Sequence, residues 1–120
     1  MKTILVVDDF ASVRFYHESL LKQSGYKTLS ARDGMEALAL LEKHPVDLVM
    51  LDVLMPKMSG TEFLQRVRAM PRFSALPILL VTSEAHMEQL QQLRDTAGVG
   101  ILPKPILPEA LRQEVQRILG

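Results

Sequence analysis

The chain has 120 residues, the length of one ordinary domain, with 14 Lys and Arg balanced by 14 Asp and Glu. Zero formal net charge argues against direct binding of nucleic acid through a broad basic face, and the absence of cysteine excludes disulfides, thiolate metal sites and a cysteine nucleophile. No apolar run approaches the ~18 residues of a membrane span, and no signal peptide is apparent, so we expect a cytoplasmic protein without membrane insertion.

Short apolar runs alternate with longer amphipathic segments along the whole chain. Continuous apolar runs are typical of strands that are buried on both faces, as in parallel sheets covered by helices. The expected elements, in chain order, are strand 4–7, helix 11–24, strand 27–31, helix 33–43, strand 48–51, helix 59–70, strand 78–81, helix 84–97, strand 99–102 and helix 108–119. This alternation predicts an α/β fold, with one doubly wound parallel sheet and helices on both of its faces.

Two expectations concern the helical surfaces. The first expected helix is predicted to pack one face against the sheet, and the apolar residues of that face are Val13, Tyr16, Leu20 and Leu21. The histidines are scattered along the chain and are predicted to be exposed and without a catalytic role; they are His17, His44 and His86.

Polar side chains with useful chemistry follow the expected strands. In doubly wound sheets, ligands bind outside the carboxyl ends of the strands. The residues expected at those ends are Asp8 and Asp9 after the first strand, Asp52 after the third, Thr82 and Ser83 after the fourth, and Lys104 and Pro105 after the fifth. We therefore expect the functional site at this edge of the sheet.

Three carboxylates that converge at one edge repel one another. At an effective dielectric constant of ~20, two unit charges ~4 Å apart cost about 4 kcal/mol, so three such pairs cost on the order of 10 kcal/mol. A single lysine, Lys104, cannot offset this repulsion, so a divalent cation is expected. Oxygen ligands without a neighbouring His or Cys favour Mg²⁺, Mn²⁺ or Ca²⁺ over zinc.

A metal ion, a lysine, a threonine hydroxyl and a spare carboxylate together suit a phosphoryl group. Phosphoryl transfer depends mainly on positioning and on charge neutralisation. The spare carboxylate can act as a nucleophile and form an aspartyl phosphate.

These residues resemble the motif of the receiver domains of two-component response regulators. The matching positions are Asp8-Asp9, Asp52 within the Leu-Asp-Val-Leu-Met-Pro segment 51–56, Thr82, and Lys104-Pro105. Finer similarity to single-domain, chemotaxis-type receivers comes from the segments 7–10 (Val-Asp-Asp-Phe), 74–77 (Ser-Ala-Leu-Pro) and 81–85 (Val-Thr-Ser-Glu-Ala). The resemblance covers the whole chain, 1–120, and implies a flavodoxin-like sheet with strand order 2-1-3-4-5.

The resemblance also implies a role for each site residue. Asp52 would accept a phosphoryl group from a phosphohistidine on a sensor histidine kinase or a histidine phosphotransfer protein. Lys104 would pair with the phosphate, and Thr82 would move to donate a hydrogen bond to it. The implied cofactor is Mg²⁺, with Mn²⁺ as a possible substitute. The implied metal ligands are Asp8, Asp9, Asp52 and the backbone carbonyl of Leu54.

Further implications concern lifetime and output. Leu54 and Glu84 lie at family positions that tune the lifetime of the phosphate, and the Lys104–Pro105 bond is cis in the family. The family catalyses its own phosphorylation and slow dephosphorylation, so the chain is not expected to be an enzyme in the usual sense. The downstream target is a protein that the sequence does not identify.

One position departs from the family pattern. Receivers usually carry Tyr or Phe three residues before the lysine, and this chain carries Ile101. In the family, this aromatic ring turns inward as the threonine moves. We therefore expect intact phosphorylation chemistry and an altered switch that involves Thr82, Ile101 and Pro105.

Two other functions are compatible with the sequence. The chain could be a receiver-like interaction module that works without phosphorylation, and Ile101 is the only support for this alternative. It could also be a Mg²⁺-dependent phosphatase of the haloacid dehalogenase group. Those enzymes usually carry a second Asp two residues after the nucleophile, where this chain has Leu54.

Overall fold

The computed structural model describes residues 1–55, 57–94 and 98–120. Its strands are β1 (Thr3–Val7), β2 (Lys27–Ala31), β3 (Leu48–Asp52), β4 (Ile78–Ser83) and β5 (Val99–Lys104). Its helices are α1 (Ala11–Gln23), α2 (Gly34–Lys43), α3 (Gly60–Arg68), α4 (Glu84–Arg94) and α5 (Pro108–Leu119), with a short 3₁₀ turn, η1 (Pro71–Phe73).

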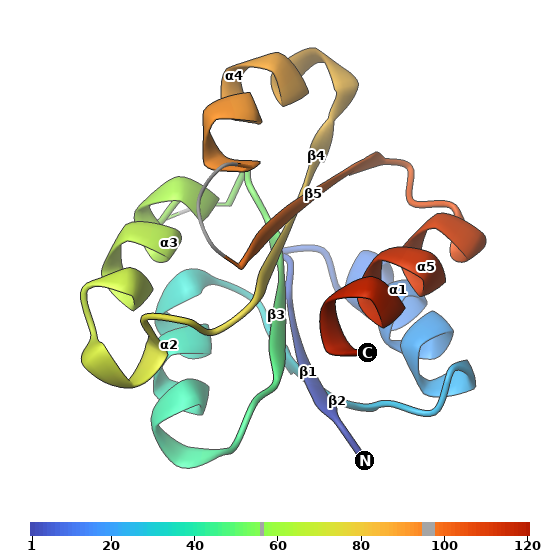
Figure 1. Ribbon diagram of the computed structural model, residues 1–120, viewed down its shortest axis with the longest axis horizontal. Coiled ribbons are helices and arrows are strands. Elements are labelled where there is room, and N and C mark those ends of the chain that lie inside the picture. Colours follow the sequence, from blue (N-terminus) through green and yellow to red (C-terminus); the bar gives the residue numbers. More distant parts are fainter. Residues whose placement is uncertain (56, 95–97) are drawn as a thin grey trace.

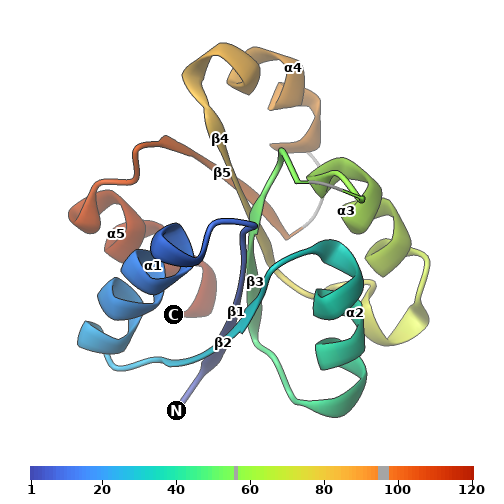
Figure 2. The same cartoon turned by 180° about the vertical axis from the view of Figure 1, so that it is seen from behind.

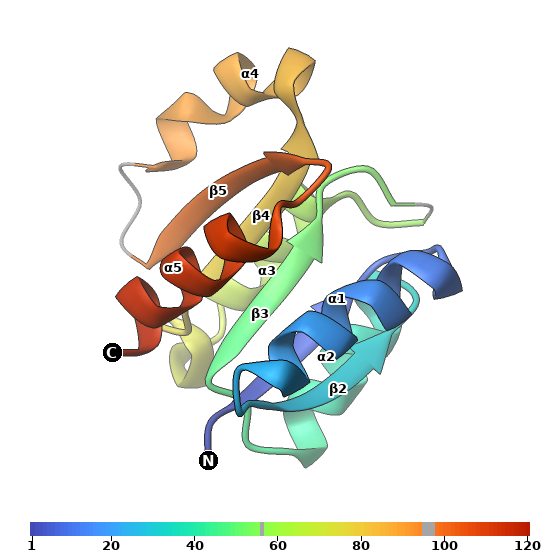
Figure 3. The same cartoon turned by 90° about the vertical axis from the view of Figure 1, so that its right-hand side faces the viewer.

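The five strands form one parallel sheet in the order β2-β1-β3-β4-β5, which confirms the predicted fold class and strand order. Helices α1 and α5 cover one face, and α2 and α3 cover the other, as seen from both sides in Figures 1 and 2. Because all strands run in the same direction, their carboxyl ends meet at one edge of the sheet (Figure 3).

Two separate apolar cores hold the helices to the sheet. One core joins alternate residues of the strands to buried residues of α2, α3 and α4, including Leu41, Phe63 and Leu90. The other core uses the intervening strand residues with α1 and α5, including Leu21 and Leu111. This division follows from the alternation of side chains across a strand, and it accounts for the continuous apolar runs in the sequence.

The predicted elements are confirmed, with differences at their ends. Strands β4 and β5 extend two residues beyond the expected ends, to Ser83 and Lys104. Helix α3 ends at Arg68 rather than at residue 70, because Pro71 starts the unpredicted turn η1. The expected helix 84–97 is described as far as Arg94, and its remaining residues lie outside the described part of the chain.

Side-chain caps define where two of the helices begin. The carboxylate of Asp33 accepts a hydrogen bond of 2.8 Å from the backbone N–H of Glu36 at the start of α2. The hydroxyl of Ser59 accepts one of 3.2 Å from the N–H of Glu62 at the start of α3. Each cap satisfies a donor that a helix N-terminus otherwise leaves free.

The packing face of α1 differs from the expected one. His17 is 5% exposed, whereas Tyr16 is 45% exposed, so the helix is rotated relative to the prediction and the predicted exposure of His17 is wrong. Val13, His17 and Leu21 are spaced by four residues and therefore follow one side of the helix. His44 is exposed, as predicted, whereas His86 is half-buried, which corrects that expectation.

Among the described residues, no helix is long and apolar enough to cross a membrane.

Candidate functional site

Three carboxylates meet at the carboxyl edge of the sheet. Asp8 and Asp9 directly follow β1, and Asp52 ends the neighbouring strand β3. One oxygen atom from each of the three lies within 4.8 Å of the others. The structure therefore brings together the three acidic residues that the sequence predicted as one group.

Lys104, at the end of β5, reaches into this acidic cluster. Its Nζ lies 3.2 Å from Oδ2 of Asp52 and 3.6 Å from Oδ2 of Asp8. Both carboxylates are buried, whereas the lysine is partly exposed. One ammonium group among three carboxylates leaves the cluster with a formal surplus of negative charge, as expected for a cation site.

Burial raises the pKa of Asp52 above its usual range. The Asp8 carboxylate raises this pKa further, while Lys104 and the backbone N–H of Leu54 lower it. That N–H donates to Oδ1 of Asp52 over 3.2 Å, and the N–H of Phe10 donates to Oδ1 of Asp8 over 2.9 Å. These backbone bonds hold the two carboxylates while leaving their Oδ2 atoms directed towards Lys104.

Two buried oxygen atoms at the site lack a protein partner. Thr82, near the end of β4, is 2% exposed. Within the described part of the chain, its Oγ1 and Oδ1 of Asp9 have no hydrogen-bond partner. A buried polar atom without a partner costs about 1–3 kcal/mol, and a ligand, an ion or an ordered water that pairs with it removes this cost. A hydroxyl suits a phosphoryl oxygen, and a carboxylate oxygen suits a hard cation.

The remaining predicted residues occupy different surroundings. Ile101 is 4% exposed and belongs to the core beneath α2, α3 and α4. The Lys104–Pro105 bond is cis, in agreement with the sequence resemblance. Leu54 presents an exposed side chain in the loop after β3, and Glu84 begins α4. Pro56 of the predicted motif lies outside the described residues.

A cleft of about 480 Å³ opens beside the carboxylates, between α1 and the connection from β5 to α5. It is lined by Ser12, Val13, Tyr16, His17, Lys104, Pro105 and Ile106. Burial lowers the pKa of His17, as does Lys104, while Asp8 opposes this shift. The four-residue spacing from Val13 to Leu21 is the sequence signal that could have placed His17 here.

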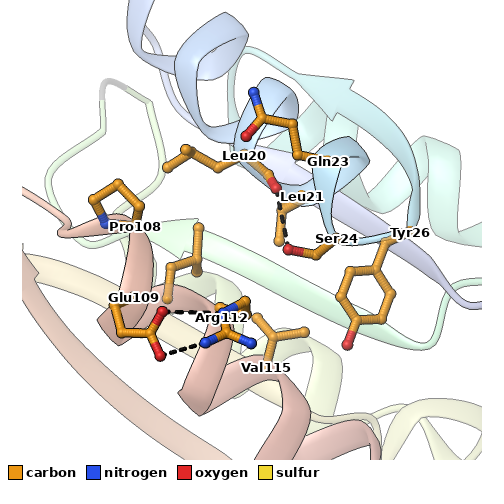
Figure 4. Close-up of a pocket in the computed structure, with 10 residues that line it drawn as sticks. Leu20, Leu21, Gln23, Ser24, Tyr26, Pro108, Glu109, Arg112 and Val115 are labelled. Carbon is orange, nitrogen blue, oxygen red and sulfur yellow. Dashed lines mark hydrogen bonds and ion pairs between the residues drawn. The ribbon is translucent and has the colours of Figure 1, made fainter.

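A second, smaller cavity of about 110 Å³ lies between α1 and α5 (Figure 4). Glu109 and Arg112 form an ion pair at this cavity, and Leu20, Leu21 and Val115 contribute apolar walls. It is too small for an ordinary ligand pocket, and it contains none of the predicted site residues.

The family model of the response regulator receiver domain matches residues 4–116. The chain belongs to this family. It therefore shares the fold and the general function of response regulator receiver domains.

Individual relatives agree with this assignment. The chain is 35% identical over 116 residues to the chemotaxis protein CheY-3 of Vibrio cholerae serotype O1, covering 96% of this chain and 89% of the relative. It is also 35% identical to the chemotaxis protein CheY of Pseudomonas aeruginosa, covering 96% and 94% of the two chains. The solved structure of chemotaxis response regulator CheY4 of Vibrio cholerae superposes with a TM-score of 0.90, at 39% identity and 99% coverage of both chains. The predicted likeness to chemotaxis-type receivers is thus confirmed.

Proposed function

We propose that this receiver domain, comprising residues 1–120, accepts a phosphoryl group on Asp52 in a Mg²⁺-dependent reaction and then switches a protein–protein interaction surface. General membership in phosphorylation-based signalling follows from the family. The roles of the individual residues are proposed from the geometry of the site.

The observation that best supports this function is that the buried hydroxyl of Thr82 has no hydrogen-bond partner among the described residues. A buried threonine without a partner is explained if a phosphoryl group on Asp52 brings an acceptor oxygen to it. Lys104 already lies 3.2 Å from Asp52, so its ammonium is placed to offset the charge that phosphorylation adds. The protein would thus gain two contacts when the phosphate is attached.

The acidic cluster fits a hard divalent cation. We assign Asp8, Asp9, Asp52 and the backbone carbonyl of Leu54 as its protein ligands, because oxygen ligands of this kind suit Mg²⁺ and also Mn²⁺. The orphaned Oδ1 of Asp9 supports the assignment. When bound, such an ion neutralises charge on the phosphoryl group during transfer.

The donor is proposed to be a sensor histidine kinase or a histidine phosphotransfer protein. Exposed aromatic side chains in α1 and at its N-terminus support a protein donor, namely Phe10, Phe15 and Tyr16, of which Tyr16 lines the cleft. Aromatic residues are enriched in the cores of protein interfaces. We propose no direct contact with nucleic acid and no membrane insertion, and we expect the protein to act in the cytoplasm.

The switch is proposed to involve Thr82, Ile101 and Pro105. Side-chain alternation places Thr82 and Ile101 on the same face of the sheet, on the paired strands β4 and β5. When Thr82 turns to a phosphoryl oxygen, it leaves space on that face, so packing near Ile101 can change. The packing of a bulky residue at position 101 can therefore change when Asp52 is phosphorylated.

Two phosphodonors test this function against its alternatives. Phosphoramidate carries a nitrogen–phosphorus bond like that of phosphohistidine, whereas p-nitrophenyl phosphate is a phosphomonoester. We expect stoichiometric phosphorylation by phosphoramidate and no sustained turnover of the ester. Sustained release of p-nitrophenol would instead support a phosphatase. Absence of phosphorylation with retained Mg²⁺ binding would support an interaction module that works without phosphorylation.

A further inference from the structure

Ser83 and His86 form a close polar pair at the edge of the phosphoryl site. Ser83 is the last residue of β4, and His86 lies in the first turn of α4. The distance from Ser83 Oγ to His86 Nδ1 is 2.6 Å, a short hydrogen bond between two half-buried side chains. Neither the predicted phosphoryl site nor the predicted metal site includes His86.

Strand geometry relates this pair to the reacting carboxylate. Strand β4 lies between β3, which ends in Asp52, and β5, which ends in Lys104. Asp52 of β3 pairs with Val81 of β4, and Lys104 of β5 pairs with Ser83. Ser83 therefore lies two residues beyond the β4 partner of Asp52. Because side chains alternate along a strand, Ser83 shares a sheet face with Asp52 and Lys104. Ser83 therefore lies at the same edge of the sheet as the Asp52–Lys104 ion pair.

We propose that His86 is a positioning residue for the hydrolysis of the aspartyl phosphate, an inference that rests on the proposed function. In this role the Ser83 hydroxyl donates the hydrogen bond to Nδ1 of His86, and the ring N–H lies on Nε2. This bond fixes the Ser83 oxygen with its lone pairs free, and they accept a hydrogen bond from the attacking water. The pair thereby holds water in place and shortens the life of the phosphorylated state.

The chemical step is the hydrolysis of an acyl phosphate. The water oxygen forms a bond to phosphorus while the bond between phosphorus and the Asp52 oxygen breaks, and that electron pair returns to the carboxylate. One proton of the water moves to a phosphoryl oxygen, so the products are the Asp52 carboxylate and H₂PO₄⁻. Positioning of the water is the contribution expected of a neighbouring side chain in such a reaction.

The decay of the phosphorylated protein tests this inference. The protein is phosphorylated with phosphoramidate and Mg²⁺, freed of the donor, and followed by intact mass. We expect Ser83→Ala and His86→Ala each to slow the decay by roughly threefold to tenfold, the effect of losing one hydrogen bond. The double variant should decay at the same rate as either single variant, because both remove the same arrangement. His86→Asn keeps an acceptor near the Nδ1 position and should recover most of the wild-type rate.

Controls separate this inference from effects on folding and from the proposed function. His44→Ala removes an exposed histidine and should decay as the wild type does. Urea unfolding of each variant reports any loss of folding. Wild-type decay in His86→Ala, multiplicative effects in the double variant, or failure of His86→Asn to recover the rate would each overturn the positioning role. Failure of the wild type itself to gain a phosphoryl group would instead overturn the proposed function.

Discussion

Nζ of Lys104 lies 3.2 Å from one oxygen of Asp52, and the same ammonium group lies 3.6 Å from Asp8. A single cation thus serves two buried carboxylates, while a third, Asp9, stands in the same cluster. The site is consequently short of positive charge in the protein alone. The same shortage of positive charge should therefore affect the stability of the fold, the binding of a metal ion and the phosphorylation of Asp52.

The metal-free protein should become more stable when Asp52 loses its charge. We expect Asp52→Asn to raise the free energy of unfolding by about 1–2 kcal/mol at pH 7, since burial penalises the charged carboxylate more than Lys104 stabilises it. The folded-state pKa of Asp52 is raised, so its contribution to stability is present at low pH and is lost as pH rises through that pKa. The difference in the free energy of unfolding between Asp52→Asn and the wild type should therefore be smaller near pH 4.

Urea unfolding in EDTA provides this measurement, and Mg²⁺ provides its control. Millimolar Mg²⁺ should stabilise the wild type, because a ligand that binds only the folded state shifts the unfolding equilibrium. Asp9→Asn should weaken this effect. A metal-free Asp52→Asn variant that is less stable than the wild type at pH 7 would contradict a net cost of the buried Asp52 charge.

His17 should make the protein sensitive to mild acid. Burial lowers its pKa in the folded state, so the neutral ring is favoured there, and stability should fall as pH drops through the unfolded-state pKa of about 6.5. We expect His17→Val to lose less stability than the wild type between pH 7 and pH 5, by about 1 kcal/mol. Chemical unfolding at both pH values measures this difference. His44→Gln is the matched control, and an equal fall in wild type and His17→Val would refute the prediction.

The sequence predicted the strands better than it predicted the surroundings of individual polar residues. The apolar runs identify buried parallel strands because both faces of the sheet are covered, and the acidic strand ends then meet by topology alone. His17 was misplaced because Tyr16 satisfies the same apolar pattern one residue earlier. A buried imidazole is tolerated there because burial lowers its pKa and so favours the neutral ring; Lys104 adds to this shift and Asp8 opposes it.

The polar pair at the end of β4 also depends on details of the fold that the sequence did not reveal. Ser83 was predicted only as a polar residue after the fourth strand, and that strand was expected to stop at residue 81. The longer strand and the immediate start of α4 bring His86 back onto Ser83. Such a contact depends on where one element ends and the next begins, and these ends are the least predictable part of a pattern.

Lys57 offers a test of backbone strain next to the site. Its φ is 69°, in the left-handed region that favours glycine. We expect Lys57→Gly to raise the free energy of unfolding by about 1 kcal/mol, because the ion pair of the exposed Lys57 side chain with Asp33, at 3.9 Å, contributes less than that. Lys57→Ala keeps the strain and removes the same ion pair, so it should not stabilise. Equal stabilities of the Gly and Ala variants in urea would rule out strain at this position.

Ile101 should influence output more than phosphorylation. Its side chain lies in the apolar core and away from the carboxylates, so Ile101→Tyr should leave the rate of phosphorylation by phosphoramidate within about twofold of the wild type. The larger ring must repack that core at a cost of about 1–3 kcal/mol, and it should change binding of the protein's target. Ile101→Val is the conservative control. Equal proportional changes in phosphorylation rate and target binding would contradict a role confined to output.

Asp52 is proposed to carry the phosphoryl group in a metal-dependent reaction. Intact mass after incubation with Mg²⁺ and phosphoramidate tests it, with EDTA and Asp52→Asn as parallel samples. We expect a gain of one phosphoryl group that is stable in acid, labile in base and absent from both parallel samples. A phosphoryl group that persists in Asp52→Asn, or that forms equally well in EDTA, would contradict it.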